Sequence, residues 1–226
     1  MKKHFIYLIF ILFPIINQAG SEKLTPSGEE KSDIYTVLHL SELGLSKEVF
    51  QLALTGHNKL EASGQLRNPD ILTVVDFSQS SKNKRMYIID LQKDTLLYNT
   101  YVAHGRNTGE EFAKSFSNES GTHKSSLGFY ITENPAMGAT VGLSLIIKGV
   151  EKGFNDKALA RAIIIHGADY ATEDFIKKNG RLGRSYGCPS VSPDLIKPVS
   201  ETMKGGSCMF IYYPDSNYRK SSALLN

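Results

Sequence analysis

The sequence lacks the features that mark two common classes of protein. It has no run of basic residues and no stretch where basic and aromatic residues interleave, and its formal charge is only +3 over 226 residues. Nucleic acid is therefore a poor candidate partner. It also has no CxxC or HxxxH-like spacing, since His104, His123, His166 and Cys188 are scattered along the chain. This argues against a zinc hydrolase.

A long apolar run is also missing. The only uncharged, almost wholly apolar run is 5–16, and a membrane-spanning helix needs about 20 apolar residues. Lys2 and Lys3 precede this run, and small or polar residues follow it at 17–21. This order is typical of a signal peptide, so we predict a signal peptide over 1–20, cleaved near Ala19–Ser21, and an exported protein. An uncleaved membrane anchor is the alternative.

The rest of the chain has the composition of one globular domain. It is 41% hydrophobic and 22% charged, which is too apolar for a disordered chain and ordinary for a single core. We predict a linker over 21–32, a catalytic domain over 33–213 whose part 33–66 is helical, and a flexible tail over 214–226. Ser46 is the expected N-cap of a helix that ends at Gly56, with a second short helix over 57–63.

From residue 71 the pattern becomes that of β-strands. Segments rich in β-branched and aromatic residues, separated by polar turns, lie at 71–77, 86–91, 96–103, 127–132, 143–147, 162–166 and 208–213. Short helices are expected over 156–161, capped by Asn155, and after the cap Thr172. A third is expected from Ser192–Pro193, with an interruption or a kink at Pro198. The chain is therefore predicted to be mainly β, in the α+β class, with short helices.

One connection is unusually long. The segment 104–126 has few apolar residues and no periodicity. Loops of this length in a compact domain are usually functional lids or mobile surface loops. We expect a lid, and a mobile surface loop is the alternative.

Two residues in the last third of the chain can carry chemistry. His166 stands where an apolar strand meets Gly167, and Cys188 follows Gly187 in a turn that presents a thiol beside backbone amides. A thiol nucleophile needs a base to form the thiolate and donors for the oxyanion, and this arrangement can supply all three. Taken singly, the histidine and the cysteine are more often structural. Together, about twenty residues apart, they favour catalysis.

The two cysteines also allow a disulfide. An exported protein with an even number of cysteines often pairs them. Cys208, however, lies in an apolar strand and is typical of a buried small hydrophobic residue, so we favour two unpaired cysteines over a Cys188–Cys208 bridge.

These motifs resemble those of a known family. The segments 165–167 (I-H-G) and 183–189 (G-R-S-Y-G-C-P) are similar to the catalytic motifs of YkuD-type murein L,D-transpeptidase domains. The closer match is the short branch whose cysteine motif reads G-R-S-x-G-C-P. Segments 74–78, 102–107 and 125–130 resemble that branch too, and the similarity covers about residues 35–213.

The resemblance implies a β-sandwich or barrel catalytic domain with a small N-terminal helical segment. It implies cysteine-dependent acyl transfer on peptidoglycan stem peptides in the periplasm or cell envelope, without metal or organic cofactor. By motif, Cys188 is the nucleophile, His166 the general base, and Gly167 orients the histidine through its backbone. The remaining candidates are oxyanion or substrate-binding residues of the cysteine motif: Arg184, Ser185, Tyr186 and Gly187.

This sequence departs from the wider family pattern at two positions. Tyr186 stands where that pattern has histidine, and Pro189-Ser190-Val191 replaces its usual Arg or Asn after the cysteine. Both changes fit the closer branch. They leave the substrate preference and the acyl acceptor open, and they do not affect the nucleophile or the base.

Several functions remain open at this point. The same site would serve an L,D-carboxypeptidase if water resolved the acyl-enzyme. A papain-like peptidase is disfavoured, because its cysteine usually precedes its histidine. A non-catalytic wall-binding envelope protein, with His166 and Cys188 as structural residues, is the alternative outside enzymes. The sequence indicates neither the oligomeric state nor the partner that presents the substrate.

Overall fold

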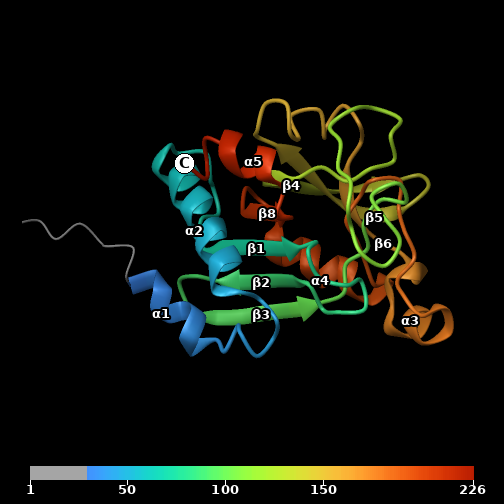
Figure 1. Cartoon of the computed structure of the whole chain (residues 1–226), viewed down its shortest axis with the longest axis horizontal. Coiled ribbons are helices and arrows are strands. Elements are labelled where there is room, and N and C mark those ends of the chain that lie inside the picture. Colours follow the sequence, from blue (N-terminus) through green and yellow to red (C-terminus); the bar gives the residue numbers. More distant parts are fainter. Residues whose placement is uncertain (1–29) are drawn as a thin grey trace, which may run out of the picture.

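The chain folds around one mixed β-sheet of eight strands, seen in a computed structural model that describes residues 30–226 (Figure 1). The strands are β1 (Ile71–Asp76), β2 (Met86–Asp90), β3 (Thr95–Thr100), β4 (Gly128–Gly138), β5 (Gly142–Gly149), β6 (Ile164–Gly167), β7 (Ser190–Val191) and β8 (Cys208–Tyr212). The helices are α1 (Glu30–Val37), α2 (Lys47–Ala62), α3 (Glu173–Asn179), α4 (Pro193–Met203) and α5 (Ser216–Ser221), with a 3₁₀ turn at Asp169–Ala171. All seven predicted strand segments contain a strand, and the mainly β fold class is confirmed.

The predicted signal peptide and most of the predicted linker lie outside the described residues. The last residues of that linker, from Glu30, belong to α1. Among the residues that the structure describes, no helix is both long and apolar enough to cross a membrane.

The order of strands in the sheet is β3-β2-β1-β8-β4-β5-β6-β7. β1 and β8 are parallel, as are β6 and β7, and the other neighbours are antiparallel. The two ends of this order meet. Just beyond β3, Ala103 exchanges backbone hydrogen bonds with Ser190 of β7, at N···O distances of 2.8 and 3.2 Å. The sheet is therefore nearly closed into a barrel.

Helices cover both faces of the central strands. Gly56 of α2 lies against the ring of Phe129 in β4, whereas Thr132, three residues further along that strand, donates a hydrogen bond to the carbonyl of Met203 at the end of α4. Residues an odd number of positions apart in a strand point to opposite faces. α2 and α4 therefore cover opposite faces of β4, and every residue of β1 and β8 is buried.

The prediction that a helix ends at Gly56 is wrong. Ser46 is the N-cap as predicted, its hydroxyl accepting from the amide of Val49, but α2 runs on to Ala62 and includes the predicted second helix. A Cβ atom at Gly56 would lie 2.0 Å from the ring of Phe129. Only glycine fits at this position, because the helix and the sheet approach too closely for a side chain. This packing outweighs the low helix propensity of glycine.

Two other predictions about helices are wrong. Residues 156–161 form turns rather than a helix, and Asn155 donates from its side chain to the carbonyls of Leu127 and Phe129 instead of capping a helix. α4 begins at Pro193 as expected but continues through Pro198 without interruption. The Thr172 cap is confirmed, since its hydroxyl accepts from the amide of Phe175.

The C-terminal segment differs from the flexible tail that the sequence predicts. It contains α5, capped by Asp215, and Tyr218 in this helix is fully buried. The phenol of Tyr218 donates to the buried carboxylate of Glu151 at 2.8 Å, and the hydroxyl of Ser222 donates to the same carboxylate. Tyr218 and Ser222 therefore anchor this segment to the barrel.

Candidate active site

The histidine and cysteine motifs meet where β6 and β7 pair. The apolar segment before His166 forms β6, and the parallel pairing sets His166 opposite Ser190. Cys188 lies two residues before Ser190, so this register brings two residues that are 22 apart in the sequence to the same end of the barrel. The first turn of α4 fixes the strand end, because Gly167 lies directly against Pro193 and Ile196.

The ring of His166 is held at both nitrogens. Its Nδ1 lies 3.0 Å from the carbonyl oxygen of Gly167, and its Nε2 lies 3.0 Å from the hydroxyl of Ser190. That hydroxyl is in turn 3.1 Å from the phenol of Tyr170. A carbonyl only accepts, so Nδ1 carries the proton, Nε2 accepts from Ser190, and Ser190 accepts from Tyr170. Gly167 thus contacts the histidine through its backbone. Its role in orienting the base stays a prediction.

Ser185 and Gly187 shape the loop that carries the cysteine, residues 183–189 (the cysteine loop). The hydroxyl of Ser185 donates to the carbonyl of Cys188 at 2.6 Å and accepts from the amide of Gly187 at 3.0 Å. Gly187 has a φ of 124°, and a Cβ atom there would lie 2.9 Å from the carbonyl oxygen of Lys124. Only glycine fits this turn without strain.

The thiol of Cys188 is partly buried and lies beside the start of β6. Its Sγ donates to the carbonyl of Ala162 at 3.8 Å. Burial raises the pKa of the Cys188 thiol, while the amide of Ile164 and the charge of Arg161 oppose that rise. Within residues 30–226 no hydrogen bond joins Sγ to the ring of His166.

Of the three amides that the sequence suggests for an oxyanion hole, one is occupied. The amide of Gly187 donates to Ser185, as described above. The amides of Tyr186 and Cys188 have no acceptor among the described residues.

The two other candidates, Arg184 and Tyr186, form no hydrogen bond with the thiol within residues 30–226. The guanidinium of Arg184 forms an ion pair with Glu110 and donates to the carbonyls of Arg106 and Gly109. The side chain of Tyr186 is 66% exposed, and its ring centroid is 4.6 Å from that of His123. Arg184 therefore holds a neighbouring loop, and Tyr186 is open to a ligand.

The long segment 104–126 packs against the cysteine loop. Ser125 accepts from the amide of Gly105 and donates to the carbonyl of Gly187, both at 3.0 Å. Backbone hydrogen bonds also join Arg106 and His104 to Ser185, at 2.7 and 3.0 Å. The segment forms one wall of the site, and its closure over a substrate stays a prediction.

A buried pair supports this wall. Arg85 is fully buried and donates to the carbonyl of Val102 and, at 2.8 Å, to Nδ1 of His104, whose Nε2 faces the carbonyl of Gly109 at 3.3 Å. Burial, helped by the charge of Arg85, lowers the pKa of His104 to about 3. His104 is therefore a neutral structural link and not a base.

Sequence reasoning missed three residues of this site: Arg161, Tyr170 and Ser190. Ser190 lies two residues after the cysteine. In an extended segment such residues point to the same side, which could have indicated Ser190 as a site residue. Nothing in the sequence pointed to Arg161 or Tyr170. Among residues 30–226, no group of three His, Cys, Asp or Glu side chains is placed to hold a metal ion, and both cysteines are unpaired.

Comparison with solved structures gives distant likenesses. An L,D-transpeptidase from Mycobacterium smegmatis is 11% identical, with 64% of this chain and 59% of that chain covered and a TM-score of 0.40. The protein Bd1075 from Bdellovibrio bacteriovorus is 15% identical, with coverage of 63% and 48% and a TM-score of 0.40. The helical cell shape determining protein Pgp2 from Campylobacter jejuni (K307A mutant) is 12% identical, with coverage of 76% and 61% and a TM-score of 0.44. The chain thus spans about half to three fifths of the length of these proteins.

Comparison with curated proteins finds no match. Comparison with protein families, in contrast, matches residues 41–212 to the L,D-transpeptidase catalytic domain of the YkuD type. This match includes the sheet from β1 to β8 and both candidate motifs. The chain belongs to the family of L,D-transpeptidase catalytic domains.

Proposed function

We propose that this chain is an exported cysteine acyltransferase that acts on peptidoglycan stem peptides. The observation that carries the proposal is the register of β6 and β7, which pairs His166 with Ser190 and so brings His166 and Cys188 to one end of the barrel. Membership of the L,D-transpeptidase family supports the substrate class. Export and location in the periplasm or cell envelope rest on the N-terminal pattern of the sequence.

The reaction begins from the protonated thiol of Cys188. The raised pKa of Cys188 keeps its thiol protonated at rest, so the proton passes to His166 as the substrate binds and the thiolate forms only in the complex. For His166 to receive that proton, its Nε2 must exchange the hydroxyl of Ser190 for the thiol, while the bond from Nδ1 to Gly167 holds the ring. Tyr170 bonds to Ser190, and Ser190 bonds to the ring of His166 until the thiol takes its place. Both act on the reaction through His166 and are positioning residues.

The thiolate of Cys188 then attacks the carbonyl carbon of the third stem residue. The oxyanion is stabilised by the amides of Cys188 and Tyr186, each worth about 3 kcal/mol in comparable sites. The bond to the terminal D-alanine breaks, and His166 returns the proton to the leaving amine. The side-chain amine of a second stem attacks the resulting thioester, forms the cross-link and releases the thiol.

Water in place of that amine would make the same site an L,D-carboxypeptidase. The long segment 104–126 packs against the cysteine loop, and a wall that limits access of water favours transfer. Transpeptidation is therefore our first choice. A wall-binding protein without activity is the remaining alternative. It does not explain why the cysteine loop presents Cys188 at the same end of the barrel as His166.

The intact mass of the protein tests the proposal. We expect a covalent adduct after incubation with a carbapenem or a disaccharide-tetrapeptide, and none with Cys188→Ala. Analysis of the products by mass spectrometry then separates cross-linked dimers from trimmed tripeptides. The absence of an adduct on folded, reduced protein would contradict acyl transfer and favour the wall-binding alternative.

A further inference from the structure

A small pocket lies beside the thiol and has no role in the mechanism above. Its volume is about 260 Å³, and its lining residues are Ser120, Gly121, His123, Arg161, Ile163 and Tyr186. Arg161 and Ile163 flank Ala162, whose carbonyl accepts from Cys188, and Tyr186 lies two residues before the cysteine. We call this the Arg161 pocket. It is large enough for one small residue of a peptide.

Within residues 30–226, Arg161 forms no ion pair with a carboxylate, although Glu119 is near enough to act on its charge. Its guanidinium donates to three neutral oxygens, the carbonyls of Ser117 and Lys124 and the hydroxyl of Ser126, at 2.6–2.7 Å. Arginine has five N–H donors, so two remain for a ligand. None of the described residues that line the pocket is Asp or Glu. A guanidinium in this state is suited to bind a carboxylate through both of its oxygens.

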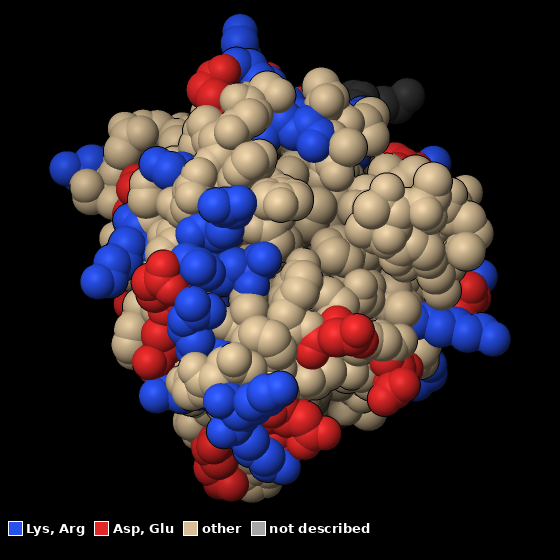
Figure 2. Space-filling model, turned by 90° about the vertical axis from the view of Figure 1, so that its right-hand side faces the viewer, with Lys and Arg blue, Asp and Glu red and all other residues tan. Residues whose placement is uncertain are grey.

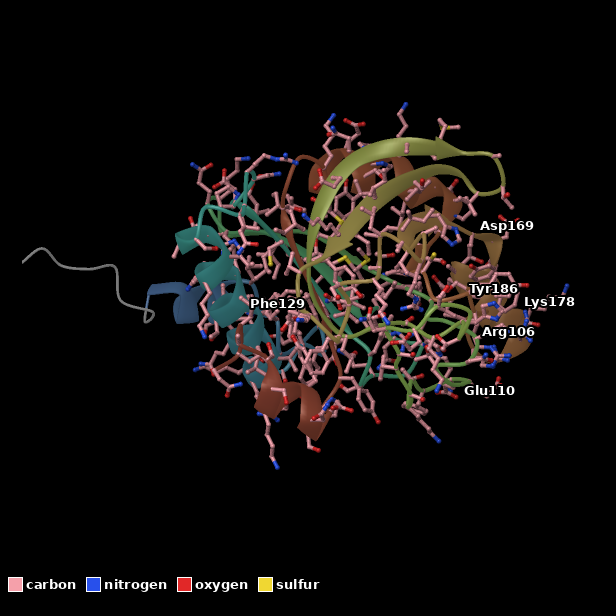
Figure 3. The ribbon with its side chains drawn as sticks, turned by 90° about the horizontal axis from the view of Figure 1, so that it is seen from above. Arg106, Glu110, Phe129, Asp169, Lys178 and Tyr186 are labelled. Carbon is pink, nitrogen blue, oxygen red and sulfur yellow. The ribbon has the colours of Figure 1, made fainter. Side chains whose placement is uncertain are left out.

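A second cation stands at the rim. The guanidinium of Arg106 lies 5.7 Å from the ring centre of Tyr186, its side chain is exposed, and it forms no hydrogen bond or ion pair with the other described residues. Arg106 and Tyr186 lie together at the end of the molecule far from α1 and α2 (Figure 3). Lys and Arg side chains gather in a column on the face at this end (Figure 2). Arg161 in the wall and Arg106 beside Tyr186 therefore give the pocket two cationic side chains that attract an anion.

We propose that the Arg161 pocket binds the free carboxylate of the terminal residue that leaves during acylation, with Arg161 at its wall and Arg106 at its rim. This inference rests on the proposed function. The carboxylate of a terminal residue lies within about 4 Å of the carbonyl that the thiol attacks, roughly the length of one residue. A cation in the wall next to Ala162 is in position to reach it. The enzyme would then select stems that end one residue after the cleaved bond.

Binding to a variant without the nucleophile tests the inference apart from the chemistry. Two tetrapeptides, one with a free C-terminal carboxylate and one with a C-terminal amide, are titrated into Cys188→Ala by calorimetry. We expect the acid to bind at least about tenfold more tightly than the amide, as for a charge-assisted hydrogen bond. Adding Arg161→Met or Arg106→Gln should bring the two affinities together, and Arg161→Lys should retain part of the preference.

The control is Lys47→Gln in the same background. Lys47 is an exposed residue at the start of α2, on the far side of the barrel, so the net charge changes equally while the preference for the acid should remain (Figure 1). Arg161 also holds the segment 117–126, and its replacement can lower stability. The side chain of Arg106 forms no hydrogen bond with the other described residues, so its replacement should not lower stability. Arg106→Gln therefore tests the inference if Arg161→Met does not fold.

Two results would overturn the inference. One is equal affinity for the acid and the amide in Cys188→Ala. The other is weaker binding of both peptides by the same factor in the arginine variants, which is the result of a purely structural role. Failure of the proposed function has a different signature, since the protein with Cys188 would then form no thioester with either peptide. A thioester formed equally fast from both would contradict the pocket alone.

Discussion

The Nε2 atom of His166 lies 3.0 Å from the hydroxyl of Ser190, so the histidine is oriented by a serine two residues after the cysteine. Ser190 is itself held by Tyr170 on one side and, through its backbone, by Ala103 on the other. The contact that closes the barrel therefore also positions the base. Changes at Ser190 should affect catalysis more than folding.

Removing that hydroxyl tests this relationship. Ser190→Ala should slow acylation by about 10-fold to 100-fold, because a misplaced base loses much of its effect, while Ser190→Thr keeps the hydroxyl and most of the rate. Single-turnover acylation measured by mass spectrometry gives the rates. ¹⁵N NMR of the imidazole should show the Nδ1–H form in the wild type and a mixture in Ser190→Ala. An alanine variant with the wild-type rate and tautomer would rule out a positioning role.

The reactivity of Cys188 should depend strongly on pH. Because burial raises the pKa of this thiol, iodoacetamide should alkylate it slowly at pH 7, and the rate should rise about tenfold per pH unit up to pH 9, as the thiolate fraction grows. Cys188→Ser serves as the control. Its remaining cysteine, Cys208, is fully buried, and burial raises its pKa strongly, so no alkylation is expected. Fast alkylation at a constant rate between pH 6 and 8 would instead indicate a resting thiolate.

The free energy of unfolding should fall as the pH drops below neutrality. His104 is 1% exposed, and its pKa is about 3 in the folded protein, against about 6.5 in an unfolded chain. The unfolded state alone takes up a proton in this window, so the contribution is complete above pH 6.5 and is lost progressively towards pH 3. Between pH 7.5 and pH 5 the loss from this residue is about 2 kcal/mol.

Urea unfolding at these two pH values measures the effect. His104→Asn keeps an acceptor for Arg85 and removes the titrating group, so the difference in stability between the two pH values should be about 2 kcal/mol smaller than in the wild type. An unchanged difference would show that His104 takes up its proton in the folded state.

Replacement of Gly187 should inactivate the enzyme without unfolding it. In Gly187→Ala the new Cβ meets the carbonyl of Lys124 at 2.9 Å in a backbone conformation that alanine rarely adopts. The cysteine loop must then shift, and a shift of about 1 Å can cost 100-fold in rate. Acylation and the melting temperature are measured together. Gly64→Ala is the matched control, because Gly64 also has a positive φ but nothing within 4 Å of the added Cβ. Wild-type activity in Gly187→Ala would contradict the geometry described here.

Removal of residues 215–226 should destabilise the whole domain. The truncation removes Tyr218, exposes the surface that its ring covers, and takes two donors, the hydroxyls of Tyr218 and Ser222, from the carboxylate of Glu151. Among the described residues, the carboxylate of Glu151 keeps only the amide of Phe129 as a donor, and the loss of the other two hydrogen bonds should cost about 3 kcal/mol. Urea unfolding of the truncated chain gives the value, and Tyr218→Phe, which loses one donor only, should cost about 1 kcal/mol. Full stability after truncation would support the flexible tail that the sequence predicts.

The sequence by itself determined the elements with strong local patterns. Period-two and continuous apolar segments predicted all the strands except the two-residue β7, and Ser46 and Thr172 predicted two caps, because these signals arise from neighbouring residues. The motifs around His166 and Cys188 likewise identified the family and the two residues of the proposed reaction. Their roles stay predictions until the adduct is measured.

Tertiary structure decided what depends on distant segments. Gly56 lies inside a helix rather than at its end, because its missing side chain leaves room for Phe129. α5 packs on the barrel because Glu151 accepts a hydrogen bond from Tyr218. The partner of His166 follows from the register of β6 and β7, and the position of Arg161 near the thiol follows from the path of the segment 104–126. Such contacts join residues far apart in the chain, so no local pattern records them. They arise only when the sheet closes.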